Sequence, residues 1–210
     1  MENLYIKDLI IRMITKVDLL NSSDQSISWK AYREAELLED ENLISDLIQI
    51  ICAEKNKNKL KSAYFILGKI SKNTDSKNAL VFLVSRASVE SDKGILQVIL
   101  DSVSDLIKPA DLDLSPLINA IDDKRWQVRQ AAIRALNHST HQEAEDRLIK
   151  VLIESKENIE LLFACYVLNN IGSHNSIIYL ENYVKSRNQD LKITSREAIK
   201  NIKTRHSINE

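Results

Sequence analysis

The feature that most constrains the fold of this 210-residue chain is an internal repeat. The segment WQVRQAAIRALN, residues 126–137, aligns with three other segments of the chain. Its Val128 corresponds to Ile95, Glu160 and Leu191 in those segments. The steps between these positions are 33 (95 to 128), 32 (128 to 160) and 31 (160 to 191) residues. Two weaker matches lie upstream, LKSAYFILG from Leu60 with one residue of slippage and WKAYREAELL from Trp29. A step of this size indicates an array of similar structural units.

The units are predicted to be helical. Apolar residues recur at helical spacing, as in the first segment, where one face is formed by Ile6, Ile10, Met13, Val17 and Leu20. The chain has only 3 Gly and 2 Pro, too few for the tight turns of a β-rich fold. No segment alternates for long enough to predict a strand.

Each unit carries a second amphipathic helix after the aligned one. The predicted second helices are residues 43–54, 77–88, 114–123, 144–155 and 176–186. Pro116 stands in the first turn of its helix, where the missing N–H costs nothing. A helix pair this small buries its apolar face only by stacking on its neighbours, so the sequence predicts an all-α solenoid of about five helix pairs.

We expect one α-solenoid domain over residues 1–210. Residues 1–20 are predicted to be a capping helix, and residues 191–210 a C-terminal helix and tail. The five repeats between them are predicted at 27–56, 57–92, 93–124, 125–158 and 159–190.

The best-formed unit, IDDKRWQVRQAAIRALN, resembles the HEAT repeat, in particular the short form named after the phycobilisome lyases. The matching residues are Asp122, Asp123, Trp126, Val128, Arg129, Ala131, Ala132, Ala135 and Leu136. The tetratricopeptide and ankyrin patterns, which have similar periods, are absent. The resemblance implies a right-handed α-α superhelix of the HEAT/armadillo type, with second helices lining a concave surface that binds partners. It also implies that Arg129 pairs with turn aspartates.

The residues capable of chemistry form no convincing site. His138 and His141, with Glu143 nearby, could hold a metal, but two ligands on a turn are weak evidence. Cys52 and Cys165 lie in apolar helical stretches and are interpreted as buried small hydrophobic residues. There is no Gly-rich phosphate loop, G-x-S-x-G or Cys-x-x-Cys motif. We therefore expect no catalytic residue, no cofactor and no metal, although an active site assembled across repeats leaves no local motif.

The charge of the chain is close to balanced. With a formal net charge of −1 it has no long-range field to attract nucleic acid or anionic membranes. Trp29 and Trp126 each open a first helix and are interpreted as packing at repeat junctions rather than as base-stacking platforms. The N-terminal residues resemble neither a signal peptide nor a membrane span, so we expect a cytoplasmic protein; the abundance of Ile, Lys and Asn suggests a bacterial one.

These observations predict a non-enzymatic scaffold or adaptor, such as an assembly factor or an immunity-type inhibitor, whose partner is another protein. Two alternatives stay open: a bilin-lyase-like subunit or chaperone, and a helical-repeat DNA-binding protein of the alkylated-base glycosylase type.

Aligning the second helices on their Leu-Ile pairs predicts a ladder of partner-binding residues along the concave face. Polar or aromatic residues one turn apart on these helices share a side. The ladder consists of Asp46, Gln49, Asn119, Arg147, Lys150, Tyr179 and Asn182.

Overall fold

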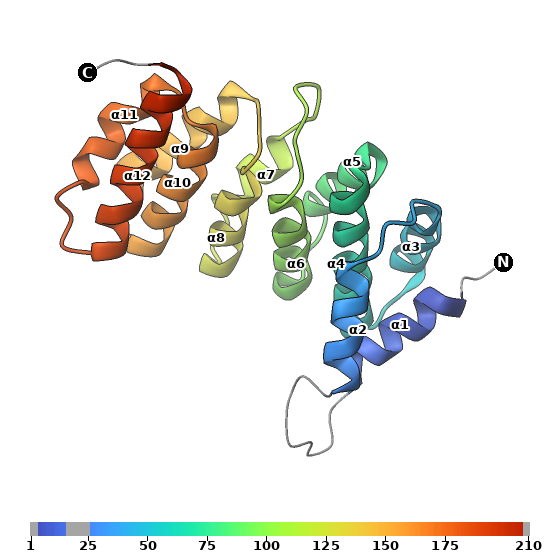
Figure 1. Cartoon of the computed structure of the whole chain (residues 1–210). Helices are drawn as coiled ribbons and strands as arrows, with labels where there is room; N and C mark the ends of the chain where they lie inside the picture. The colour runs from blue at the N-terminus through green and yellow to red at the C-terminus, as the bar shows by residue number, and fades with distance from the viewer. Residues whose placement is uncertain (1–3, 16–25, 208–210) are drawn as a thin grey trace. The chain divides into compact units, whose positions relative to one another are not determined.

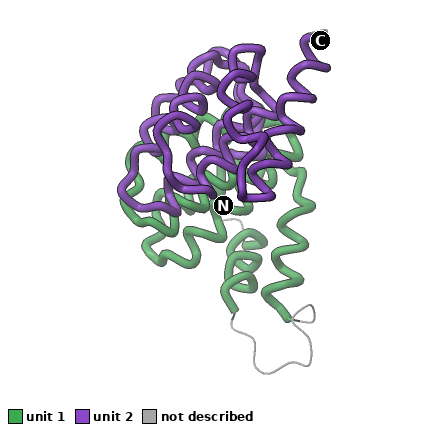
Figure 2. Tube along the Cα trace, turned by 90° about the vertical axis from the view of Figure 1, so that its left-hand side faces the viewer, with its two compact units in different colours: residues 1–103 green, residues 104–210 purple. Residues whose placement is uncertain are grey.

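The structure, a computed structural model, describes residues 4–15 and 26–207, and it is all-helical (Figure 1). The described residues contain no β-strand, only one isolated bridge between Lys108 and Ser139. The chain divides into two compact units, residues 1–103 and 104–210, which Figure 2 shows in green and purple. The predicted all-α fold is confirmed.

Unit 1 contains the first six helices. They are α1 (Leu4–Ile14), α2 (Ile27–Glu36), α3 (Asn42–Ala53), α4 (Lys57–Thr74), α5 (Lys77–Ala87) and α6 (Lys93–Ser104), the last of which ends at the unit boundary. In the predicted first helix Ile6, Ile10 and Met13 are buried, whereas Val17 and Leu20 lie outside the described residues. Helix α1 packs on α2 and α4, and its role as a cap stays a prediction.

Unit 2 contains the remaining helices. They are α7 (Ser115–Ala120), α8 (Trp126–Ala135), α9 (Gln142–Glu154), α10 (Asn158–Ile171), α11 (His174–Leu180), the short 3-10 helix η2 (Glu181–Tyr183) and α12 (Gln189–Arg205). Pro116 occupies the first turn of α7, as expected. Helix α10 contacts α8 and α12 on either side and α9 behind, so the aligned first helices stack in a row.

Local sequence signals explain where the helices begin. Side-chain oxygens of Ser26, Asn56, Ser173 and Asn188 accept backbone N–H groups in the first turns of α2, α4, α11 and α12. Such caps satisfy donors that have no partner inside the helix, and each stabilises its helix by about 1 kcal/mol.

Small residues set how closely the first helices approach. Ala131, Ala132 and Ala135, the three alanines of the repeat signature, are all fully buried in α8. In unit 1, a Cβ on Gly68 of α4 would lie 2.5 Å from the Cβ of Ser102 on α6, so only glycine permits this contact. The repeat pattern thus encodes close packing of successive first helices.

Candidate functional site

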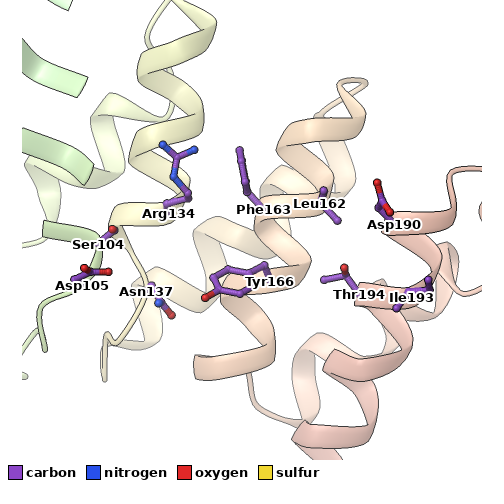
Figure 3. A pocket seen from close by; sticks show the side chains of 10 residues that line it. All are labelled: Ser104, Asp105, Arg134, Asn137, Leu162, Phe163, Tyr166, Asp190, Ile193 and Thr194. Atoms are coloured by element: carbon purple, nitrogen blue, oxygen red, sulfur yellow. The ribbon is translucent and has the colours of Figure 1, made fainter. Parts of the chain in front are cut away.

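An open groove lies along the first-helix row of unit 2 (Figure 3). It has a volume of about 590 Å³ and is open to solvent. Its lining comes from α8, α10 and α12, from the end of α6 and the residue that follows it, and from the turn after α8. The lining residues are Ser104, Asp105, Arg134, Asn137, Leu162, Phe163, Tyr166, Asp190, Ile193 and Thr194.

Helix α10 forms the apolar middle of the groove. Leu162, Phe163 and Tyr166 extend from it, and Ile193 faces them from α12 (Figure 3). Tyr166 is 49% exposed and Ile193 is 52% exposed, so both present apolar surface to solvent. The Arg134 guanidinium lies 4.6 Å from the ring centre of Phe163. A cation over an aromatic face holds both side chains in a defined orientation.

Polar groups flank the apolar middle. Asp105 and Ser104 lie on one side and Asp190 and Thr194 on the other (Figure 3). Both aspartates are exposed, and together with Arg134 they give the lining a formal charge of −1. The groove therefore combines an apolar centre with carboxylates at its edges.

A row of asparagine amides begins at the groove and crosses three helices. Asn170 Nδ2 of α10 donates to Asn137 Oδ1 at 2.9 Å, and Asn169 Nδ2 donates to Asn170 Oδ1 at 3.0 Å. From α12, Asn201 Nδ2 donates to Asn169 Oδ1 at 2.8 Å. Asn137 and Asn170 are 33 positions apart, and Asn169 and Asn201 are 32 positions apart. The row therefore follows the step of the repeat.

The segment after α6 fixes Asn137 in place. Lys108 is fully buried, and its Nζ donates to the Asn137 carbonyl at 2.5 Å while its backbone N–H donates to His138 O at 3.0 Å. Burial lowers the pKa of the Lys108 amine to about 7, against the opposing effect of the Asp105 carboxylate. His138 adopts φ 57, which turns the chain away from the end of α8.

The histidines considered for metal binding have other roles in this turn. His141 Nε2 donates to the carbonyl of Pro109 at 2.7 Å, which ties the turn to the same segment that carries Lys108. Within residues 4–15 and 26–207, no three His, Cys, Asp or Glu side chains are grouped as metal ligands.

The predicted ladder residues lie on second helices with at least part of their surface exposed. Gln49, Asn119, Lys150 and Asn182 are exposed, and Asp46, Arg147 and Tyr179 are half-buried. Arg147 Nη2 lies 2.5 Å from the Asp122 carboxylate, and only 10% of the Arg147 side chain is exposed. Partner binding by the ladder stays a prediction. The groove lies on the first helices of the repeats, not on the second helices that carry the ladder.

Two expectations about single residues need correction. Cys52 is exposed, because it lies at the end of α3 on the side away from buried Leu47 and Ile51; Cys165 is buried, as expected. Arg129 Nε pairs with the Glu160 carboxylate at 2.8 Å and reaches the turn only through backbone carbonyls. The Asp123 carboxylate pairs instead with Arg125, two residues away.

Sequence reasoning missed the groove residues. The one available signal was the presence of Tyr166 and Ile193 outside the apolar stripes that the repeats align. Large apolar side chains at solvent-facing helix positions mark interaction surfaces when they cluster.

The stacked helix pairs and the open groove define an α-helical repeat scaffold of the HEAT/armadillo type. Residues 114–200 match the family model of HEAT repeats. This part of the chain is thus similar to HEAT repeats, and the narrower phycobilisome-lyase form stays a prediction. Comparison with curated proteins gives no match.

Solved structures share the fold at low sequence identity. One designed armadillo repeat protein aligns with a TM-score of 0.57 and 16% identity, covering 94% of this chain and 99% of the other. A second, solved in complex with peptide (KR)4, gives 0.60 and 15%, with coverage of 94% and 99%. An engineered protein gives 0.58 and 16%, covering 95% and 97%.

No helix among the described residues is long and apolar enough to cross a membrane.

Proposed function

We propose that this protein is a protein-binding scaffold and that the groove of unit 2 holds a segment of its partner. The observation that carries the proposal is the groove itself, an open cavity of about 590 Å³ with an apolar centre and charged edges. Sites of this kind bind through a few anchoring side chains surrounded by polar contacts.

The apolar centre fits one or two apolar side chains of a partner. Phe163 is already oriented by Arg134, and Tyr166 offers a large ring that loses little conformational freedom on binding. Tyrosine and arginine are enriched among residues that contribute most to binding free energy. Burying the exposed parts of Tyr166 and Ile193 supplies the hydrophobic contribution.

The edges of the groove favour a partner segment that carries lysine or arginine beside its apolar anchor. Asp105 and Asp190 flank the apolar centre and outnumber the single cation, Arg134. A cationic side chain at either end would meet a carboxylate, which directs the orientation of the segment more than it adds affinity. One armadillo neighbour was solved with the peptide (KR)4, which agrees with this preference.

The asparagine row can pair with the backbone of an extended segment. Each amide has two donors and two acceptor lone pairs, and the mutual contacts of Asn137, Asn170, Asn169 and Asn201 use only part of this capacity. Hydrogen bonds to a partner backbone contribute affinity whatever the sequence of the partner. Specificity for a particular sequence then comes from the side chains that fit the groove.

Selection from a random decapeptide library displayed on phage tests this function. The purified protein should enrich sequences with Lys or Arg next to an apolar residue. Peptides made from those sequences should bind with anisotropy changes that saturate. Replacing Tyr166 and Ile193 with Ala should weaken the binding of these peptides at least tenfold, a change of about 1.4 kcal/mol.

The matched control for this selection is a double variant on the other helices, Lys150→Ala with Asn182→Ala, both exposed in the structure. It should bind the selected peptides like the wild type. Enriched peptides that bind the Tyr166/Ile193 variant as tightly as the wild type would refute the groove as the binding site.

The ladder on the second helices is a second candidate surface for the same function. It includes Asp46, Gln49, Asn119, Arg147, Lys150, Tyr179 and Asn182, all at least partly exposed. Loss of binding in the Lys150/Asn182 variant would support the ladder in place of the groove.

A further inference from the structure

Unit 1 carries a separate surface in which cations and aromatic rings alternate, which we call the basic aromatic stripe. It is formed by one side of α2 and one side of α4, two helices in contact (Figure 1). Its members are Trp29, Tyr32, Arg33, Lys61, Phe65, Lys69 and Lys72.

Helix α4 shows how sharply this surface is defined. From residue 61 to residue 72, only Lys61, Phe65, Lys69 and Lys72 have appreciable exposure, and every other residue is buried. Spacings of four, four and three residues place them on one side of the helix. The solvent side of the middle of α4 is therefore three lysines and a phenylalanine.

Helix α2 continues the same surface. Trp29 is 40% exposed and Tyr32 is 38% exposed. The Tyr32 and Phe65 rings meet edge to face with their centroids 5.1 Å apart, which joins the two helices.

The cations of the stripe are held by the rings. The Arg33 guanidinium lies 4.9 Å from the Trp29 ring centre, and Lys69 Nζ lies 5.2 Å from that of Phe65. The nearest counter-charge to Arg33 is Glu36 on its own helix, in a pair at 2.6 Å whose arginine side chain is 59% exposed. An exposed pair three residues apart contributes little, so an incoming carboxylate can replace Glu36 at small cost.

The stripe has an excess of positive charge. Its four cations are Arg33, Lys61, Lys69 and Lys72. Helices α2, α4 and α6 together carry three acidic residues, Glu34, Glu36 and Asp101, and Glu34 is already paired with Arg12 of α1. This local charge contrasts with the formal net charge of −1 for the whole chain. The complementary ligand is anionic and also has apolar groups to cover the rings.

We propose that the basic aromatic stripe binds an acidic protein segment in which Glu or Asp alternates with apolar side chains. A nucleic acid fits less well, because single strands bind by stacking their bases on open aromatic faces. Here Arg33 and Lys69 cover one face of Trp29 and Phe65, and Tyr32 packs its ring against Phe65. Carboxylates reach the cations without needing those faces.

Fluorescence of Trp29 provides a direct test, since the chain has only 2 tryptophans. In a Trp126→Phe protein, titration with the octapeptide (Glu-Leu)4 should change Trp29 emission and saturate. Affinity should fall at least tenfold when salt is raised from about 50 to about 300 mM. The peptide (Lys-Leu)4 and the oligonucleotide dT12 serve as competing probes.

Charge variants distinguish the stripe from the rest of the protein. The double variant Arg33→Gln with Lys69→Gln should bind (Glu-Leu)4 at least tenfold more weakly than the wild type. The control, Lys185→Gln with Lys200→Gln, removes the same charge from exposed positions in unit 2 and should leave binding unchanged. Circular dichroism establishes that both variants are folded.

Several results would overturn the proposal: no saturable change with (Glu-Leu)4, equal loss in both double variants, or tighter binding of dT12 than of the acidic peptide. Trp29 emission that depends on protein concentration without peptide, matched by sedimentation of a dimer, would mean that a second copy of the chain occupies the stripe. The selection that tests the groove uses other residues, so either proposal can fail alone.

Discussion

Arg129 Nε on α8 lies 2.8 Å from Glu160 Oε1 on α10, and the two residues belong to successive repeats. Glu160 occupies the repeat position that Val128 and Leu191 fill with apolar side chains. Its carboxylate is only 9% exposed and also accepts a hydrogen bond from Ser155 Oγ at 2.7 Å. A buried acid therefore replaces an apolar contact at the junction of two repeats.

Replacing Arg129 with Met should destabilise the protein by about 2–4 kcal/mol, because it leaves the Glu160 carboxylate buried without its cation. Adding Glu160→Leu should recover most of the loss, since Leu restores the apolar residue that the repeat position favours. Urea denaturation of the two single variants and the double variant measures this coupling.

The exposed pair Lys150–Glu154, at 3.9 Å, is the control for the Arg129 experiment. Lys150→Ala should change stability by no more than about 0.5 kcal/mol. A double variant Arg129→Met/Glu160→Leu as unstable as Arg129→Met alone would show that the pair does more than fill an apolar junction.

Glu145 joins α9 to the start of α11. Its Oε1 accepts hydrogen bonds from Ser173 N, Ser173 Oγ and Ser176 Oγ at 2.7, 2.9 and 2.6 Å. Burial raises the pKa of this carboxyl, but these donors outweigh it and hold the pKa below its usual value. The stability that the carboxylate contributes is present above the unfolded-state pKa of about 4.3 and is lost as the pH falls through the folded-state value.

Glu145→Gln should therefore cost about 1–2 kcal/mol at pH 7 and progressively less toward pH ~3. Urea denaturation at a series of pH values measures the difference between the two proteins. A difference that stays constant with pH would mean that the charge of Glu145 is unimportant.

Lys108 should also make stability increase with pH, but at neutral to alkaline pH instead of acidic pH. With a folded-state pKa of about 7, below the unfolded value of about 10.4, the amine binds a proton in the unfolded chain but not in the native one between these limits. The burial cost of the ammonium is full below pH ~7 and is relieved as the pH rises.

The stability of the wild type relative to Lys108→Met should accordingly rise by more than about 1 kcal/mol between pH ~7 and pH ~9. Subtracting the variant cancels the other titrating groups. A flat difference over this range would show that Lys108 is charged in the native protein.

The two cysteine thiols, Cys52 and Cys165, should react with a thiol reagent at very different rates. Cys52 is exposed, whereas burial raises the pKa of Cys165 to about 12. Since the thiolate is the reactive form, an aromatic disulfide reagent should modify one thiol quickly in the native protein and two after unfolding. Rapid reaction that persists in Cys52→Ser would contradict this assignment.

The fold could be predicted because the repeat step and the alanines of residues 131–135 directly encode helices that stack closely. The helix pairing needed no knowledge of any partner. The repeat pattern marks α2 only by the weak match at Trp29. In the structure the helix begins at Ile27, where the Ser26 side chain accepts the Trp29 N–H.

The groove could not be predicted, because its depth depends on how three helices are spaced and not on any one of them. Tyr166 and Ile193 lie on different helices, and sequence alone does not bring them together. The asparagine row shows the same limit. Nothing in the sequence marks Asn137, Asn169 and Asn201, because the hydrogen bonds of the row connect residues of different helices. The resemblance to HEAT repeats predicts a binding surface on the second helices instead.

Binding through the groove is tested most directly by comparing two variants for their affinity toward peptides selected on the wild-type protein. The groove variant carries Tyr166→Ala and Ile193→Ala, and the ladder variant carries Arg147→Ala, Lys150→Ala, Tyr179→Ala and Asn182→Ala. If the groove is the binding site, the groove variant loses at least tenfold in affinity while the ladder variant binds normally. Normal binding by the groove variant, together with loss in the ladder variant, would contradict binding through the groove.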